Sequence, residues 1–541
     1  MIRIQQLNLE IPSFHTEEEY DEYQKAQLEK KIIKLLKINN KDVISWNIVR
    51  RSLDARKKPT LYYSYIVDVR VKNEAEVLRK SRLKNAYVIA EKEYEFPKVS
   101  NPEAYSRPVI IGLGPAGLFC GYYLAKQGLR PILLERGKKV DERLQDVEEF
   151  WNTGVLNTAS NVQFGEGGAG TFSDGKLNTL VKDKYGRNKE VLQVFVENGA
   201  PEKILYDQKP HIGTDVLMDV VRNMRTKMLQ WGAEIHYETQ MTEMLQEEKR
   251  ITGVKTASGD IYSSNAVVLA IGHSARDTFQ MCHENKLAME AKSFAVGFRV
   301  EHPQELINVQ QYGKDYPDCL PTAAYKVTAK ADKGRGVYSF CMCPGGYVVN
   351  ASSEEGLLAI NGMSYSKRDG KNANSAIIIS VTGEDFSGQG PLSGVEFQRQ
   401  IEKKAYEIGK GKIPVQYYKD FKKKSEHKGQ IPEDFAPAMK GCYTFGNVNE
   451  ILPEELNQSF IQGMEHFHKI IPGFADDLAL VSGIESRTSS PLRILRDESG
   501  QSTSLKGVYP CGEGAGYAGG ITSAAMDGIY IAERIVLNHE S

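Results

Sequence analysis

The sequence is poor in several features that would place it in a special class of protein. It has seven cysteines in 541 residues, an odd number scattered from Cys120 to Cys511, which excludes the disulfide framework of a small secreted domain. No apolar run approaches the roughly 20 residues that a membrane helix needs. The start of the chain lacks a basic segment followed by an apolar core, so we expect no secretory signal. These absences predict a reduced, cytoplasmic protein with no membrane partner.

The sequence also lacks an excess of charge of either sign. The formal net charge is −1, so nothing draws the whole molecule toward nucleic acid or an anionic membrane, and we expect no nucleic-acid partner. Apolar residues make up 41% of the chain and charged residues 26%, which are the proportions of a globular protein. The chain is too long for one ordinary core, and its length favours about three structural units.

The most informative stretch runs from residue 108 to residue 137. A short apolar strand leads into Gly112-x-Gly114-x-x-Gly117, an apolar-faced helix follows, and a second apolar run ends at Glu135. In such a unit the first glycine makes the tight turn, the second lets a pyrophosphate approach the backbone, and the third lets the helix pack on the strand. The helix N-terminus then holds the phosphates, and the acid binds the adenosine ribose. The order of these features predicts a dinucleotide site and leaves NAD and FAD as alternatives.

Residues 1–100 are expected to form a separate small domain. Its strands and helices follow a β-α-β-β-α-β order, which is typical of a ferredoxin-like α+β fold. The strands are expected over residues 2–11, 43–53, 60–72 and 87–90, and the helices over residues 17–38 and from Glu74. A basic connection is either a surface for an acidic partner or a solvated hairpin end, and we favour the second reading; its residues are Arg50, Arg51, Arg56, Lys57 and Lys58. Residues 1–100 are also a candidate surface for a protein partner.

Two later segments are rich in glycine. Residues 165–170 contain four glycines, which leave backbone N–H groups unshielded, and this suits a planar or anionic ligand better than a flexible loop. Residues 507–535 read as a strand, a glycine-rich turn and a helix that begins near Gly520. Between these segments, residues 293–480 mix alternating strands with glycine turns, and we expect them to form an inserted α+β substrate or cap domain.

The pairing of GLGPAGL with the C-terminal YPCGEGAGYAGGITSAAMDG resembles the glutathione-reductase type of FAD-binding fold. The motifs GEGGAGTFSDGKL, CMCPGG, SRTSSPLRI and GEGAGYAGG are similar to those of a bacterial family of FAD-dependent oxidoreductases labelled NAD(FAD)-utilising dehydrogenases. The resemblance covers the chain from about residue 100 to the end. It implies an α/β fold in which a Rossmann-like FAD-binding domain has two parts, residues 101–292 and 481–541, on either side of the inserted domain.

The resemblance also implies which residues hold FAD. The first glycine turn would bind the pyrophosphate, Glu135 the adenosine ribose, and Glu513 the ribityl chain, while the last helix would favour negative charge on the reduced flavin. The full set of implied FAD-binding residues is Gly112, Gly114, Pro115, Ala116, Gly117, Glu135, Arg136, Gly165, Gly167, Gly168, Ala169, Gly170, Met241, Gly272, Gly512, Glu513, Gly520, Ile521 and Thr522.

No motif fixes the catalytic side chains, and the candidates are Lys176, Cys343 and Arg487. Lys176 is either a group that stabilises a carboxylate or an anionic flavin, or an ordinary surface lysine. Arg487 is either a clamp for an acidic substrate or the partner of a local carboxylate. Cys341 and Cys343 form a CxC whose thiols are either redox-active or structural, and we favour structural cysteines. We expect no metal site.

Flavin would carry the redox chemistry. Residues 276–443 contain no second GxGxxG, so we expect no NAD(P)H domain and consider NAD(P)H only as a transient donor. His211 and His273 are candidates for proton transfer. The favoured function is an FAD-dependent oxidoreductase that transfers hydride between the flavin and an unidentified small-molecule substrate. The alternatives are an FAD-containing protein that serves RNA modification, and a non-catalytic protein that binds flavin or docks a partner.

Overall fold

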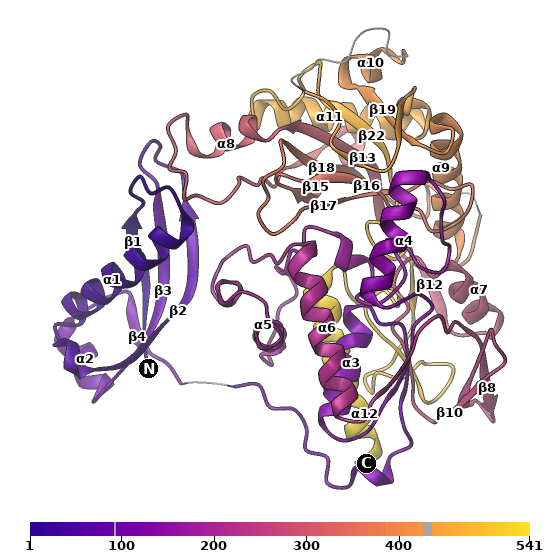
Figure 1. Ribbon diagram of the computed structural model, residues 1–541, viewed down its shortest axis with the longest axis horizontal. Coiled ribbons are helices and arrows are strands. Elements are labelled where there is room, and N and C mark those ends of the chain that lie inside the picture. The colour runs from indigo at the N-terminus through magenta and orange to yellow at the C-terminus, as the bar shows by residue number, and fades with distance from the viewer. Residues whose placement is uncertain (91–92, 387, 426–434, 541) are drawn as a thin grey trace.

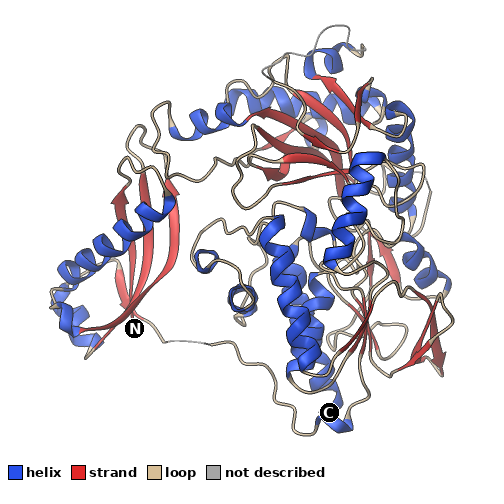
Figure 2. Ribbon diagram, viewed as in Figure 1, coloured by secondary structure: helices blue, strands red, loops and turns tan. Residues whose placement is uncertain are grey.

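The computed structural model describes residues 1–90, 93–386, 388–425 and 435–540. It is a mixed α/β structure in which a small N-terminal sheet stands beside two larger layered regions (Figures 1 and 2). Within the described residues, no helix is both long enough and apolar enough to cross a membrane.

The N-terminal elements follow the order expected for residues 1–100. Their antiparallel sheet has the strand order β2-β3-β1-β4, and both helices cover one face of it (Figure 1). The alternating residues of β3, from Tyr63 to Val71, are buried against this face. The elements are β1 (Ile2–Glu10), α1 (Glu17–Leu36), β2 (Val43–Asp54), β3 (Tyr62–Val71), α2 (Glu74–Ser81) and β4 (Ala86–Val88).

The expectation that the basic connection is a solvated hairpin end is wrong for Arg51. This residue is 4% exposed, and its guanidinium donates to Asp207 at 2.7 and 3.1 Å and to Asp21 at 3.0 Å. The backbone of Arg51 also pairs with residues 206–208, which lie beside the edge strand β2. The carboxylate that buries this arginine lies far along the chain, so local sequence could not reveal it.

A five-stranded parallel sheet, of order β24-β11-β5-β6-β7, carries the first glycine turn. Alternate residues of β5 face opposite sides: Ile110 packs on the helices α3, α5, α6 and α12, and its neighbours pack toward an antiparallel hairpin region and α7. The strands are β5 (Val109–Ile111), β6 (Ile132–Leu134), β7 (Glu234–His236), β11 (Val267–Leu269) and β24 (Val508–Pro510). The helices are α3 (Pro115–Lys126), α4 (Val140–Thr153), α5 (Arg187–Glu197), α6 (Thr214–Gln230), α7 (Arg276–Glu284) and α12 (Ile521–Glu540).

Three smaller sheets flank the two large ones. The hairpin region has the order β10-β9-β8, two short strands β12 and β23 pair with each other, and a third sheet has the order β17-β16-β20. These strands are β8 (Met241–Glu247), β9 (Arg250–Thr256), β10 (Ile261–Ser263), β12 (Met289–Ala291), β16 (Tyr347–Asn350), β17 (Ile360–Met363), β20 (Met439–Lys440) and β23 (Leu492–Ile494).

The region expected as an insertion is built on a seven-stranded sheet of order β14-β15-β18-β13-β22-β19-β21. Its last strand in sequence, β22, extends to Glu485, past the expected boundary at residue 480. The strands are β13 (Phe294–Pro303), β14 (Thr328–Lys330), β15 (Gly336–Cys343), β18 (Asn372–Val381), β19 (Ile413–Tyr417), β21 (Tyr443–Phe445) and β22 (Leu480–Glu485). The helices are α8 (Gln304–Tyr312), α9 (Ser393–Gly409), α10 (Tyr418–Lys423) and α11 (Glu454–Ile470).

Candidate functional site

The first glycine turn joins β5 to α3 as tightly as its sequence predicts. Gly112 has φ +97°, and a Cβ on Gly117 would lie 1.9 Å from the Gly112 carbonyl oxygen, so helix and strand meet without room for a side chain. Gly114 precedes the first residue of α3 and supplies no side-chain cap. The first N–H groups of α3 therefore have no side-chain acceptor and give this end of the helix a partial positive charge.

Glu135 connects the first glycine turn to the second glycine loop. Its carboxylate is 5% exposed and accepts hydrogen bonds from the backbone N–H groups of Leu113 at 2.8 Å, Gly137 at 2.9 Å and Gly165 at 3.0 Å. Gly165 belongs to the loop of residues 165–170, so one carboxylate fixes the spacing of the two glycine segments.

Arg143, on α4, holds the second glycine loop, and sequence reasoning did not identify it. Its fully buried guanidinium donates to the carbonyls of Asn161, Val162, Gly165, Glu166 and Gly168 at 2.8–3.3 Å. Burial lowers the pKa of Arg143 to about 10. The loop is thus held by a buried cation through its carbonyls, which leaves its N–H groups to other partners. An arginine within a polar helix gives no sequence signal for this role.

These segments enclose a cavity of about 450 Å³. Most of the residues expected to bind FAD line this cavity. They come from the parts of the sequence that precede and follow the strands of the seven-stranded sheet. Those that line it are Gly112, Gly114, Pro115, Ala116, Glu135, Arg136, Gly165, Gly168, Ala169, Gly170, Met241, Gly272, Glu513, Gly520 and Ile521. The two distant glycine turns, near Gly114 and near Glu513, therefore meet at one cavity.

Four of the expected FAD-binding residues lie behind the cavity wall. Gly117 is packed on the Gly112 carbonyl, and a Cβ on Gly512 would lie 2.5 Å from the Ala116 Cβ. The N–H of Gly167 donates to the Leu113 carbonyl at 2.8 Å. The hydroxyl of Thr522 donates to the Leu177 carbonyl at 2.7 Å. These residues shape the wall and do not line the cavity.

The C-terminal turn places Glu513 beside His273. The Glu513 Oε1 lies 3.1 Å from Nδ1 of His273, and both residues line the cavity. Within the described part of the chain, the buried Nε2 of His273 has no hydrogen-bond partner. A carboxylate on one ring nitrogen and a free second nitrogen is an arrangement suited to holding or moving a proton. His211, in contrast, does not line the cavity, and burial lowers its pKa to about 4.

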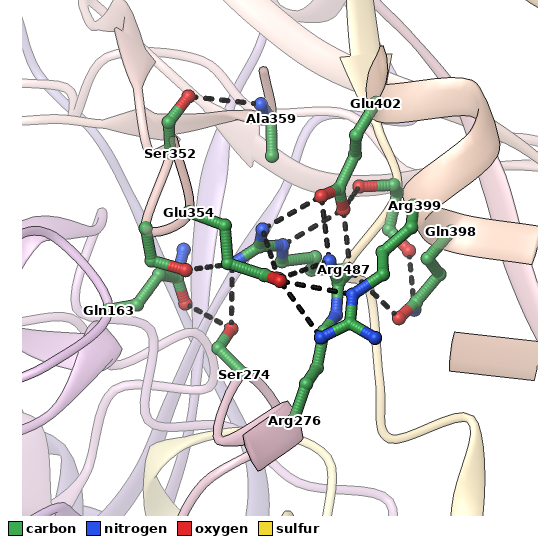
Figure 3. A network of polar contacts seen from close by, with 12 residues as sticks. Gln163, Ser274, Arg276, Ser352, Glu354, Ala359, Gln398, Arg399, Glu402 and Arg487 are labelled. Atoms are coloured by element: carbon green, nitrogen blue, oxygen red, sulfur yellow. Dashed lines mark hydrogen bonds and ion pairs between the residues drawn. The ribbon is translucent and has the colours of Figure 1, made fainter. Parts of the chain in front are cut away.

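Among the catalytic candidates, Arg487 lines the cavity, but its guanidinium is paired with the buried carboxylate of Glu402. Glu402 of α9 accepts from Arg487 at 2.9 and 2.8 Å and from Arg276 at 2.7 and 2.9 Å, as Figure 3 shows. Burial alone would raise the pKa of Glu402, but the two arginines outweigh it and hold the pKa well below its usual range. Arg487 also donates to Ser274 and Ser353. The second of its two readings, a partner for a local carboxylate, matches this geometry.

Lys176 also lines the cavity, in a group of cations. Its Nζ lies 3.5 Å from Asp174, a fully buried carboxylate that also accepts from Arg368 at 2.9 Å and through a second bond. Lys209 and Lys326 line the cavity with side chains still open to solvent, which places them where it opens. No ion pair joins either lysine to a carboxylate among the described residues. Partial burial, together with Lys176 and Arg368, lowers the pKa of Lys209.

Cys341 and Cys343 lie at an irregularity of strand β15. Strand β15 advances three residues from Phe340 to Cys343 while its partner β18 advances two, from Ala376 to Asn374, which defines a β-bulge. Cys341 has φ +45°. Residues two apart in a regular strand share a face, and the bulge interrupts this pattern between Phe340 and Cys343. The Cys343 thiol donates to the Cys341 carbonyl at 3.2 Å. Cys341 lines the cavity, whereas the candidate Cys343 lies behind it.

No group of three or more His, Cys, Asp or Glu side chains suited to a metal ion occurs in the described residues.

A protein of Clostridium beijerinckii is 45% identical to this chain over 515 residues, which cover 94% of this chain and 95% of that protein, and it carries the name "Uncharacterized protein". The two chains belong to one family. Residues 293–488 match the family described as FAD-dependent protein, C-terminal domain-like, and residues 1–70 match a domain of unknown function, DUF8436. The first of these matches supports FAD as the cofactor of this family.

Other proteins are similar to the chain at a lower level. A ribosomal RNA dihydrouridine synthase of Haemophilus influenzae is 24% identical over 179 residues, covering 31% of this chain and 40% of that protein. A flavin-dependent brominase triple mutant shares 12% identity with a TM-score of 0.38, covering 81% of both chains. Glycine oxidase from Bacillus cereus shares 12% identity with a TM-score of 0.31, covering 81% of this chain and 96% of that one. The two structural similarities are too weak to carry an argument about function.

Gly114→Ala is expected to block a cofactor without harming the fold. Gly114 has φ −69°, and a Cβ there would meet only the Gly168 Cα, at 3.8 Å, so alanine fits the protein but projects where the pyrophosphate would approach. We expect an unchanged melting temperature and an FAD affinity lower by about tenfold or more, measured by fluorescence titration of the apoprotein. Gly383→Ala is the matched control, because a Cβ there meets nothing within 4 Å and Gly383 lies outside the cavity. Equal FAD affinity in the two variants would contradict the site.

Glu402→Gln is expected to destabilise the fold by about 3–5 kcal/mol, because it leaves two buried guanidinium groups short of a partner. The folded-state pKa of Glu402 is lowered, so its stabilisation is complete above the unfolded pKa of about 4.3 and is lost as the pH falls further. Urea unfolding should therefore show a constant gap between wild type and variant near neutral pH and a narrowing gap in acid. Glu407→Gln, at an exposed position of the same helix, should show neither effect.

Proposed function

We propose that the protein is an FAD-dependent oxidoreductase of the NAD(FAD)-utilising dehydrogenase type, which transfers hydride between the flavin and a small molecule. The observation that carries the proposal is the meeting of three glycine segments, around Gly114, Gly168 and Gly520, on one cavity. The description of the matched family as FAD-dependent supports the choice of cofactor over NAD.

The residues of the cavity fit FAD. The N-terminus of α3 and the open position at Gly114 suit a pyrophosphate, and the buried carboxylate of Glu135 suits the adenosine ribose. The N-terminus of α12 begins at Ile521 on the cavity wall, where its dipole favours negative charge. When bound, the flavin would supply the two-electron chemistry, and the protein would supply orientation and electrostatics.

The chain's own groups suit an anionic substrate. Lys176, Lys209, Lys326 and Arg368 line the cavity, and the carboxylate of Asp174 offsets only part of their charge. A carboxylate or phosphate that enters past Lys209 and Lys326 would meet these cations at short range, in surroundings less polar than water. The pair of Glu513 and His273 would hold or accept a proton beside the reacting atoms.

One observation favours a second candidate function, an FAD protein that serves RNA modification. The similarity to a ribosomal RNA dihydrouridine synthase extends over 179 residues. The cations at the cavity opening would bind the phosphates of an RNA strand as readily as a small acid. The net charge of −1 argues against a broad RNA-binding surface, so the small-molecule reading is preferred.

The purified protein is expected to be yellow and to carry FAD, and a donor should bleach it in the absence of oxygen. The test is an anaerobic titration with NADH and NADPH, followed by flavin absorption, together with analysis of copurified nucleic acid. Bleaching with no bound RNA supports the oxidoreductase. Specific binding of ribosomal RNA at physiological salt would favour the second candidate. A protein that cannot be reconstituted with FAD would contradict both.

Lys209→Met is expected to weaken binding of anions to the flavin-loaded protein several-fold, because it removes one of the cations at the cavity opening. Binding is measured by titrating inorganic phosphate and succinate at constant ionic strength and following the flavin absorption. Lys182→Met is the matched control, since Lys182 is exposed and lies outside the cavity wall. Equal binding by wild type and both variants would refute an anionic substrate.

A further inference from the structure

The cavity has a second wall, which lies outside the glycine segments. Strands β15, β17 and β22 contribute to it, through residues that include Ser339, Met342, Asn361 and Glu485. None of these four residues belongs to the set expected to bind FAD. A substrate that reacts with the flavin has to lie in the part of the cavity that the cofactor leaves free. We therefore expect the substrate to contact this second wall, which we call the sheet wall.

Glu485 contributes a buried carboxylate to the sheet wall. Its side chain keeps 4% of its surface accessible, and its Oε2 accepts a hydrogen bond from the guanidinium of Arg299 at 2.8 Å. Among the residues that the structure describes, its second oxygen, Oε1, has no hydrogen-bond partner, yet this oxygen is not closed off from solvent. Because Glu485 lines the cavity, the cavity is the space that gives access to Oε1. An ionised carboxylate accepts several hydrogen bonds, so Oε1 is free to accept one from a ligand.

Arg299 holds Glu485 in one position. The guanidinium of Arg299 is fully buried on β13 and donates to three further groups on neighbouring strands. These are the side chains of Asn374 at 2.8 Å and Asn361 at 3.2 Å, and the carbonyl of Cys341 at 2.5 Å. Burial of Arg299 requires a counter-charge, which the carboxylate of Glu485 supplies through Oε2. That requirement does not account for the position of Oε1 at the cavity.

The other carboxylates nearby do not offer a free oxygen to the cavity. Among the described residues, Glu135 and Glu513 also line it. Glu135 accepts hydrogen bonds from three backbone N–H groups, and Glu513 lies 3.1 Å from His273. Both belong to segments expected to hold the cofactor. Glu301 is buried as Glu485 is, but it does not line the cavity, and its unpartnered oxygen is inaccessible to solvent.

The surroundings of Glu485 also suit proton transfer. Burial raises the pKa of Glu485 to about 7, against the opposing positive charge of Arg299. Cys341 is the other titratable group that faces this carboxylate, and its negative charge when ionised raises the pKa further. A carboxyl group with this pKa is present in both protonation states at neutral pH. It is therefore able to accept a proton during a reaction and to release it afterwards.

We propose that Glu485 is a catalytic base, whose Oε1 accepts the proton of a hydroxyl or amino group on the carbon that loses hydride. The proposal rests on the proposed function, because the flavin is the hydride acceptor. In the step, the C–H bond breaks and the hydrogen leaves with its electron pair to the flavin. The O–H or N–H bond also breaks, its proton goes to Oε1, and its electron pair forms the C=O or C=N bond. The substrate thereby loses two electrons, and the flavin gains them.

The proposal narrows the class of substrate. The cations of the cavity, which include Lys176 and Arg368, suit a carboxylate, and Glu485 suits a proton donor on the same small molecule. The substrate is therefore a small acid that carries a hydroxyl or amino group on a carbon with a hydrogen to lose.

The first test compares acetate, glycolate and glycine as ligands of the flavin-loaded full-length protein. Glycolate adds a hydroxyl group to acetate, and glycine adds an amino group. Affinities are measured from the flavin absorption at constant ionic strength over a range of pH. The affinity ratio of glycolate or glycine to acetate cancels the effect of pH on the carboxylate that all three share. For the acid with the matching group, this ratio should rise by about fivefold or more as Glu485 ionises, with a midpoint near pH 7.

Glu485→Gln should make this ratio independent of pH, because an amide does not titrate in the range. Glu301→Gln is the matched control. Glu301 is also fully buried, with a pKa that burial raises to about 7, but it lies outside the cavity, so this variant should keep the wild-type dependence. Ratios near one at every pH for both glycolate and glycine, or the same dependence in wild type and Glu485→Gln, would overturn the proposal.

The second test uses the wild-type protein alone and does not depend on a variant that folds. Infrared difference spectra at neutral pH compare the protein bound to glycolate or glycine with the protein bound to acetate, so that carboxyl groups away from the ligand, such as Glu301, cancel. The matching acid should leave a smaller protonated-carboxyl band than acetate does, because its added group stabilises the ionised form of Glu485. Identical bands for all three acids would contradict the role of Glu485 and leave the flavin assignment intact.

Failure of the proposed function has a different result. A protein that binds no flavin loses the hydride step, and with it the oxidoreductase assignment. The infrared comparison on that flavin-free protein then still decides whether Glu485 contacts the added hydroxyl or amino group.

Discussion

The structure depends on one buried carboxylate shared by two arginines. Glu402 lies on α9, Arg276 on α7, and Arg487 in the segment between β22 and β23. Each charge would be costly to bury alone, and the three are stable together only when all of these segments are in place. The ion-pair network therefore couples correct assembly of the two large regions to the geometry of the cavity, which Arg487 and its partner Ser274 line.

The glycine segments are positioned by a different use of buried charge. Glu135 accepts hydrogen bonds from backbone N–H groups, and Arg143 donates hydrogen bonds to backbone carbonyls. The loops around the cavity are therefore fixed by two side chains of opposite charge. Glycine gives these loops close approach to a ligand but no rigidity of its own. The two side chains supply the rigidity, and the shape of the cavity is thereby fixed before any ligand binds.

The parts of the fold that follow from local rules could be predicted from the sequence. The turn at Gly112 and the packing of Gly117 are dictated by backbone geometry, and they recur in the structure as expected. The small N-terminal sheet follows from the alternation in residues 61–71. The bulge at Cys341 could not be predicted, because one extra residue reverses the alternation without a local signal. Arg51, Arg143 and Glu402 were also beyond prediction, since their roles are set by residues far away in the chain.

The anchoring of the N-terminal sheet has a consequence for the opening of the cavity. Arg51 donates a hydrogen bond to Asp207, which lies two positions before Lys209. The N–H of Leu177, the residue after Lys176, donates to the Pro210 carbonyl at 2.9 Å. The edge strand β2 of the small sheet is thus joined to the segment that carries Lys209, and that segment is joined in turn to the one that carries Lys176. The small sheet thus contacts the outside of the segment that ends at the cavity opening, although no residue of that sheet lines the cavity wall.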